Sequence, residues 1–189
     1  MKVPCIFDNR YKKLKDIKMR FSVFGKFLGA GLIVALLATS CLTSKDNEYT
    51  PERERQLLND YITNLIQKGY NVDTTAKGVF YVNIDNGSGN FPQAGDTLSV
   101  MYAGYLVNGT LFDSSVFHST DSTYHFIYKV DNMIEGWDDI MAIMNKGRRV
   151  EFIVPSSLAY GSKGAGFSIP PYTPLVFVAK MMNIRPKAN

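Results

Sequence analysis

The sequence predicts a domain of class α+β, in which a curved antiparallel sheet of five or six strands wraps over one short helix. Three observations lead to this prediction. Short alternating segments, rich in β-branched and aromatic residues, recur between turn signals from residue 78 to residue 184. One segment among them has helical spacing instead, and a separate amphipathic helix precedes them all. Strands that gather apart from the helices are typical of this class.

A basic and then apolar segment opens the chain. Several Lys and Arg residues precede an apolar run over residues 27–38, and small residues then lead to Cys41. These are the parts of a secretory signal, and the run is short for a bilayer span. We therefore expect a signal peptide over residues 1–40, with Met19 as an alternative start. The structural alternative is a single-pass anchor or a buried helix.

Cys41 is predicted to carry a lipid. Cys5 lies before the expected cleavage point, so the mature chain would have no partner for an internal disulfide. The residues around Cys41 resemble the lipobox of bacterial lipoproteins, although Leu37 lies four places before the cysteine rather than three. The residues after it resemble the surface-export tag of Bacteroidetes lipoproteins. The resemblance implies a lipidated tether over residues 41–50, anchored in the cell envelope at the outer membrane.

The distribution of charge argues against a nucleic-acid partner. The formal net charge is +4, but up to Thr50 nine Lys and Arg residues stand against four acidic ones. From Pro51 onward the numbers are twelve and thirteen. The positive excess therefore belongs to the N-terminal segment, and the remainder carries no sign of a phosphate-binding surface.

Residues 51–69 are predicted to form a helix. Thr50 suits the N-cap, Pro51 suits the first helical position, and Glu54 favours the positive end of the helix dipole. Apolar residues then recur at three- and four-residue spacing up to a glycine. One apolar stripe must therefore be buried, either on the following domain, which we favour, or on a second copy of the helix.

The remaining elements belong to one domain over residues 78–185. Strands are predicted at residues 78–85, 96–107, 110–113, 124–128, 148–154 and 175–184. Asn108 and Gly109 form a type I′ hairpin signal between the second and third strands. A helix is predicted from Trp137 to Met144, with acidic residues in its first turn and Gly147 at its end.

The sequence lacks the residue sets of nucleophilic, phosphate-binding or metal-dependent catalysis, and no cofactor is expected. His118 and His125 are predicted to be surface residues rather than ligands. Apolar and aromatic residues instead gather at strand ends and in loops, which favours a concave site for an apolar ligand. They are Tyr102, Phe112, Tyr124, Phe126, Met133, Ile134, Trp137, Tyr160, Ile169 and Phe177. Taken alone, Trp137, the only tryptophan, would be predicted to pack in the core.

Five blocks of this region, in order, resemble the FKBP-type peptidyl-prolyl cis-trans isomerases. They are residues 100–106, 109–115 with Phe-Asp-Ser-Ser, 134–137 with Ile-Glu-Gly-Trp, 158–161, and 169–177. The resemblance covers residues 78 to 184 and implies an FKBP-like fold and rotamase activity. Its substrates would be X-Pro segments of unfolded or exported proteins, and macrolides would be candidate inhibitors.

The resemblance also implies a role for each candidate residue. Trp137 would be an exposed ring on the floor of the pocket, Asp113 the acid at its rim, and Tyr160 a hydroxyl that holds a substrate carbonyl. These three are the candidate catalytic residues. The walls would be Tyr102, Phe112, Tyr124, Met133, Ile134, Ile169 and Phe177, with Ile169 pointing inward from the closing loop. Glu135 is expected at the rim.

Such a pocket can catalyse isomerisation without acid–base residues, because rotation about the X-Pro bond breaks no σ bond. Amide resonance sets a barrier of about 18–20 kcal/mol. An apolar site disfavours the charged, planar amide relative to the twisted one, and a matching shape adds differential binding. The alternative is a non-enzymatic chaperone or peptide-binding module that uses the same apolar cleft. The complete residue set favours the enzyme.

Overall fold

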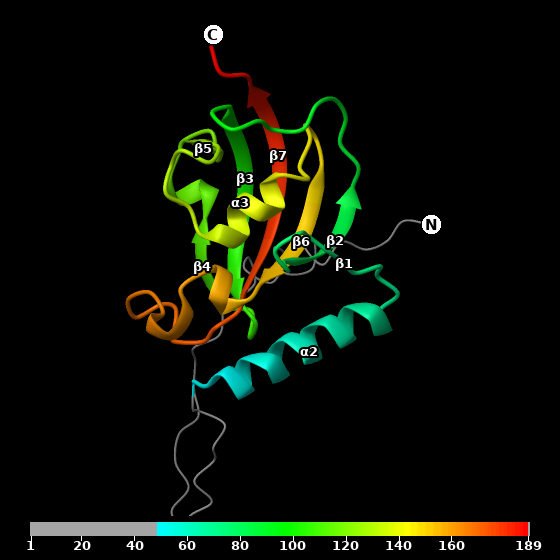
Figure 1. Ribbon diagram of the computed structural model, residues 1–189, viewed down its shortest axis with the longest axis vertical. Helices are drawn as coiled ribbons and strands as arrows, with labels where there is room; N and C mark the ends of the chain where they lie inside the picture. The colour runs from blue at the N-terminus through cyan, green and yellow to red at the C-terminus, as the bar shows by residue number, and fades with distance from the viewer. Residues whose placement is uncertain (1–48, 189) are drawn as a thin grey trace, which may run out of the picture. The chain divides into compact units, whose positions relative to one another are not determined.

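The computed structural model describes residues 49–188, which form a seven-stranded antiparallel sheet and two α-helices (Figure 1). The predicted α+β class and the additional N-terminal helix are confirmed. The strand count is seven rather than five or six, because β1 (Asp73–Thr74) is too short to show an alternating pattern. The expected signal peptide over residues 1–40 and the expected lipid-bearing Cys41 lie outside the described residues.

The two longest strands of the sheet, β3 (Thr97–Leu106) and β7 (Leu175–Arg185), pair along their whole length. Besides these and β1, the strands are β2 (Phe80–Asp85), β4 (Leu111–Ser114), β5 (Tyr124–Ile127) and β6 (Arg149–Val154). The order is β1-β2-β6-β7-β3-β4, and β5 also pairs with β3. β5 pairs with the first half of β3 and β4 with the second half. The two short strands therefore follow each other along one edge of β3.

The helix α3 (Glu135–Met141) lies across one face of the sheet (Figure 1). Its residues Ile140 and Met141 are fully buried against the sheet. Gly136 allows the close approach, since a Cβ there would lie 2.3 Å from Val154 Cγ1 of β6. The helix ends before the predicted Met144, because the amide of Met144 bonds to the carbonyl of Met141, three residues back.

The hairpin between β3 and β4 differs from the predicted type I′ turn. The amide of Gly109 donates to Leu106 O at 2.8 Å, and the amide of Leu106 donates to Thr110 O at 2.9 Å. Gly109 has φ 89°, whereas Asn108 is not among the residues with positive φ. A type I′ turn would need a positive φ at both positions, so this is a three-residue loop that ends in a left-handed glycine.

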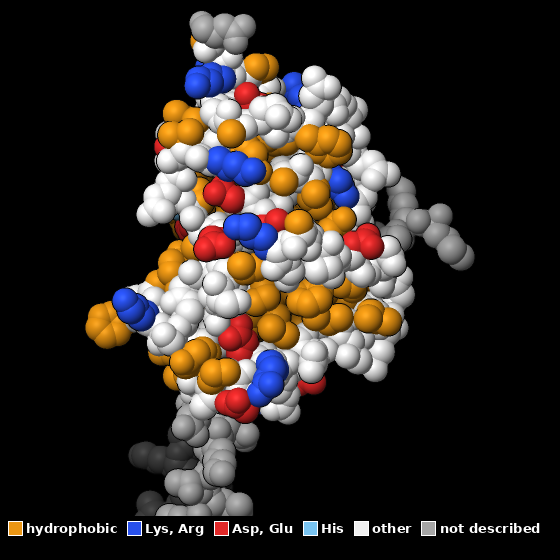
Figure 2. All heavy atoms as spheres, in the orientation of Figure 1, with side chains coloured by type: hydrophobic (Ala, Val, Ile, Leu, Met, Phe, Trp, Pro, Cys, Tyr) orange, Lys and Arg blue, Asp and Glu red, His pale blue; other side chains and the backbone are white. Residues whose placement is uncertain are grey.

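The N-terminal helix α2 (Pro51–Gln67) packs on the domain that follows it. Thr50 caps it, accepting a hydrogen bond from Arg53 N at 3.2 Å. Leu65 is buried, and the Tyr61 hydroxyl donates to Glu151 of β6. Figure 2 shows apolar side chains gathered between α3 and α2, with charged side chains of both signs scattered over the same face. The apolar stripe of α2 is therefore buried against the domain that follows it, which is the alternative that we favoured from the sequence.

No helix within residues 49–188 combines the length and the apolar character needed to cross a membrane.

Candidate active site

A cavity of about 510 Å³ opens where β3, β4, β5 and β7 approach the first turn of α3. The predicted catalytic and substrate-binding residues all line it, except Ile169. They are Tyr102, Phe112, Asp113, Tyr124, Met133, Ile134, Trp137, Tyr160 and Phe177. Four strands, the first turn of α3 and the loops that carry Met133 and Tyr160 thus converge on one apolar, mostly aromatic site.

Trp137 forms the floor of the cavity but is not an exposed ring. It is only 2% exposed, because it packs against four neighbouring rings, those of Tyr102, Phe126, Phe152 and Phe177. Its ring centroid lies 5.0 Å from that of Tyr102 and 5.4 Å from that of Phe177, both edge-on. The expectation of an exposed ring is therefore wrong, and the same side chain is both core and cavity lining. Its Nε1 is buried without a hydrogen-bond partner among the described residues.

The aromatic walls depend on a glycine. The rings of Phe112 and Phe177 meet edge-to-face at 5.6 Å. A Cβ at Gly104 of β3 would lie 2.8 Å from Phe112 Cζ and 2.8 Å from Phe177 Cε1. These distances are shorter than carbon atoms tolerate, so a glycine at this position lets both rings close over the strand.

A carboxylate at the rim joins three polar partners. Asp113 Oδ2 accepts a hydrogen bond from the Tyr102 hydroxyl at 2.6 Å. Its Oδ1 accepts from Ser114 N at 2.7 Å and lies 2.7 Å from His118 Nε2. Both carboxylate oxygens are therefore engaged by neighbours in the chain.

His118 is exposed, as predicted, but it also belongs to the site, which the sequence did not predict. It lines the cavity, stacks on Tyr102 at 6.4 Å and meets Tyr124 edge-on at 5.4 Å. The short 3₁₀ turn η3 (Ser115–Phe117) brings it back to Asp113. Asp113 and His118 are five residues apart on either side of this turn, and that spacing in the sequence could have suggested the pair. The other lining residues outside the candidate set are Asn132, Glu135 and Ala159.

The hydroxyls of Tyr102 and Tyr160 have raised pKa values and stay protonated into the alkaline range. Burial, followed by the hydrogen bond to Asp113, raises the pKa of Tyr102 far above its ordinary value. Burial, followed by the charge of Asp113, raises the pKa of Tyr160. No hydrogen bond from the Tyr160 hydroxyl is found within residues 49–188, so this donor is available to a ligand at the mouth of the cavity.

Ile169 does not line the cavity. It is 5% exposed and belongs to the hydrophobic core. Its backbone pairs with that of Ala165, which folds the loop back on itself and turns Ile169 into the core. Phe126, another member of the apolar set, is likewise buried at 2% exposure. Glu135 lies at the rim, as expected, and its carboxylate is 3.1 Å from Lys77 Nζ.

No cluster of three potential metal ligands is found in the described part of the chain. The site instead offers a cavity walled by aromatic rings, the carboxylates of Asp113 and Glu135, and the hydroxyl of Tyr160, which has no hydrogen-bond partner among the described residues. This arrangement can enclose a small apolar ring and hold an adjacent carbonyl by a hydrogen bond.

The seven-stranded antiparallel sheet with α3 across one face is an FKBP-like fold. Residues 88–182, about half of the chain, match the family described as FKBP-type peptidyl-prolyl cis-trans isomerase. The chain belongs to this family, as the sequence blocks predicted.

Similar proteins are found in several organisms. A probable FKBP-type isomerase of Haemophilus influenzae is 36% identical over 122 residues, which are 65% of this chain and 49% of that protein. FK506-binding protein 1 of Dictyostelium discoideum is 35% identical over 108 residues, 57% of this chain and 99% of that protein. The crystal structure of FkpA from Escherichia coli, at 29% identity, superposes with a TM-score of 0.62 over 72% of this chain and 61% of that one. The chain spans about half the length of the bacterial relatives it matches.

Proposed function

We propose that the chain is a peptidyl-prolyl cis-trans isomerase that acts on exposed X-Pro segments. The observation that carries the proposal is the aromatic cavity with Trp137 at its floor and the available Tyr160 hydroxyl at its mouth. A proline ring is small, apolar and suited to such a cavity. Family membership supports the same reaction.

The proposed mechanism needs binding and desolvation rather than proton transfer. The proline ring would rest on Trp137, and Tyr160 would donate to a substrate carbonyl beside the rotating bond. The planar amide carries more charge than the twisted one, so the apolar walls raise the energy of the ground state relative to the transition state. Hydrogen bonds that fit only the twisted conformer lower the barrier further.

Asp113 would act by position and charge rather than as a base. Both of its oxygens already accept hydrogen bonds or face His118. It would hold the Tyr102 ring against Trp137 and set the negative potential at the rim, while isomerisation itself needs no proton acceptor.

The direct test is an exchange assay on short X-Pro peptides with the pure protein. Uncatalysed isomerisation takes tens to hundreds of seconds, so acceleration is readily seen by protease coupling or NMR exchange. A rate equal to that without protein would overturn the proposal. A macrolide of the FK506 type is proposed to occupy the same cavity, since one relative is named for binding it. It should inhibit the reaction and change the fluorescence of Trp137.

We also infer that the protein is lipid-anchored through Cys41 and works on exported proteins in the cell envelope, at the outer membrane. The support is the sequence of residues 1–50: a basic region, an apolar run and a cysteine after small residues. Mass spectrometry of the mature protein should find an acylated Cys41. A Cys41→Ala form that stays membrane-bound would contradict the anchor.

A second candidate function is a chaperone that binds unfolded chains without turnover. Large apolar side chains at the surface favour it, with Phe117 65% exposed and Phe167 fully exposed. Trp137→Ala separates the two: loss of isomerase activity with aggregation suppression retained would place chaperone activity on a different surface. Loss of isomerase activity and of aggregation suppression together would place both activities in the cavity.

A further inference from the structure

Helix α2 carries a buried carboxylate that reaches the catalytic domain. Glu54 is 9% exposed, and Ser156, 102 residues further along the chain, is 3% exposed. Glu54 Oε1 accepts a hydrogen bond from Ser156 N at 2.5 Å, and Oε2 accepts from Ser156 Oγ at 2.6 Å. Burial of a carboxylate is unfavourable unless such charge-assisted hydrogen bonds replace its hydration. Glu54 is thus committed to this one partner.

Ser156 begins the segment that forms one wall of the cavity. It opens the 3₁₀ turn η4 (Ser156–Leu158), directly after β6 ends. Its carbonyl accepts a hydrogen bond from Ala159 N at 2.9 Å. Ala159 and Tyr160 both line the cavity. The orientation of Ser156 therefore sets the direction in which the chain reaches Tyr160.

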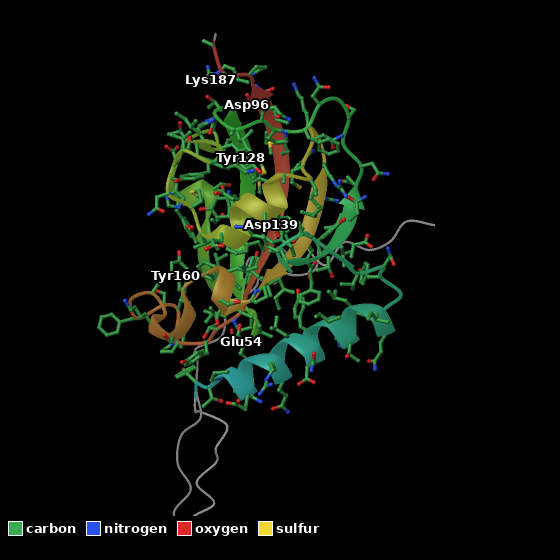
Figure 3. All side chains as sticks on the ribbon, in the orientation of Figure 1. Glu54, Asp96, Tyr128, Asp139, Tyr160 and Lys187 are labelled. Atoms are coloured by element: carbon green, nitrogen blue, oxygen red, sulfur yellow. The ribbon has the colours of Figure 1, made fainter. Side chains whose placement is uncertain are left out.

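Two attachments hold α2 itself. The Tyr61 hydroxyl donates to Glu151 Oε1 at 2.5 Å, and Glu151 is 8% exposed on β6. Leu65 is buried one turn further along. Figure 3 labels Glu54 and Tyr160 at the same end of the domain. Glu54 is therefore presented to Ser156 by a docked helix rather than by a free end.

We propose that Glu54 is a positioning residue for the cavity, which places the Ala159–Tyr160 wall by holding Ser156. The inference rests on the proposed function, because the wall matters through the Tyr160 hydroxyl. It assigns a role to α2, which lies outside the residues 88–182 that match the family. The helix that precedes the domain would thereby set the position of one wall of the cavity.

The test compares Glu54→Gln and Ser156→Ala with Glu52→Gln. Glu52 lies on the same helix, but its side chain is 72% exposed, so it is the matched control. We expect both test variants to lower kcat/KM on an X-Pro peptide by about fivefold to tenfold, because small displacements of a positioned group are expensive for catalysis. The control should match the wild type. Thermal unfolding confirms that each variant is folded at the assay temperature.

A second measurement separates positioning from a general loss of stability. In a Tyr160→Phe background, Glu54→Gln should lower kcat/KM little further, because the two changes act through the same hydroxyl. Fully additive losses would overturn the inference. So would a folded Glu54→Gln protein with wild-type kcat/KM.

An NMR comparison keeps the inference testable if the protein proves not to be an isomerase. The backbone amide signals of Ala159 and Tyr160 should shift and exchange faster with solvent in Glu54→Gln than in Glu52→Gln. If the wild-type protein shows no isomerase activity but these amide signals still shift in Glu54→Gln, the proposed function is rejected and the role of Glu54 stands. Unchanged signals would reject the role of Glu54, whatever the activity.

Discussion

The floor and the rim of the cavity are held by different interactions. At the floor, Trp137 is 2% exposed and packs on the rings of Tyr102 and Phe177. At the rim, the side chain of His118 is 41% exposed and that of Asp113 is 33% exposed, joined by a contact of 2.7 Å. Close packing is strongly coupled to stability, whereas exposed ion pairs contribute little. Changes at the floor should therefore lower stability and function together, and changes at the rim should lower stability less.

The largest effect is expected from Trp137→Ala. Removing this ring should lower the free energy of unfolding by about 3–5 kcal/mol and reduce isomerase activity strongly. Denaturant unfolding and the X-Pro assay measure the two effects. Phe126→Ala is the control, because Phe126 is equally buried but does not line the cavity. Phe126 also packs on the Trp137 ring, so a second control is Ile153→Ala, since Ile153 is 1% exposed and lies outside the cluster that holds Trp137. The Ile153 variant should lose stability while keeping activity per folded molecule, and Trp137→Ala with wild-type activity would contradict the floor assignment.

The next largest effect is expected from Gly104→Ala. The new Cβ would press on Phe112 and Phe177, so the free energy of unfolding should fall by about 1–3 kcal/mol. The displaced walls should also raise KM more than they lower kcat. An unchanged KM would show that these rings do not shape the substrate site.

Asp113→Ala tests how firmly the rim is tied to the floor. It leaves the Tyr102 hydroxyl without its acceptor, which should cost about 1–2 kcal/mol of stability and lower kcat/KM modestly. The pKa of Tyr102 should fall toward its ordinary value, because the carboxylate that raises it is gone, although burial remains. Spectroscopic titration of the tyrosines measures this. A variant that fails to fold would mean that Asp113 is chiefly a structural cap.

Tyr160→Phe should change function with hardly any change in stability. The residue is 41% exposed, so the free energy of unfolding should stay within about 0.5 kcal/mol. Loss of one hydrogen bond to the substrate should lower kcat/KM by about tenfold. Tyr49→Phe, at the exposed start of the described chain, should leave both quantities unchanged. Wild-type activity in Tyr160→Phe would remove the hydroxyl from the mechanism.

The smallest effect is expected from alkaline pH. The pKa values of Tyr102 and Tyr160 are raised in the folded state above the ordinary 10.0. The unfolded state therefore loses these protons first, and stability declines as pH rises above about 10. Unfolding measured at a series of pH values should show this decline, and Tyr102→Phe should make it shallower. Stability that rises across this range would contradict the assigned direction.

Much of the site could be predicted because its residues lie in short contiguous blocks. The run that ends in Trp137 places the floor at the first turn of α3, and Tyr102, Phe112 and Phe177 come from strands with clear alternation. The seventh strand was missed because two residues carry no periodicity. The turn at Gly109 was misassigned because the same dipeptide fits two loop lengths.

Local sequence by itself determined the α+β class, the positions of α2 and α3 and the apolar character of the cavity, since propensity and hydrophobic period act over a few neighbouring residues. Tertiary structure alone decided that Trp137 both packs in the core and lines the cavity, that Ile169 turns into the core and that His118 meets Asp113. It alone also joined Glu54 to Ser156. These outcomes depend on which side chains packing brings together from distant parts of the chain, and neither propensity nor hydrophobic period specifies such partners.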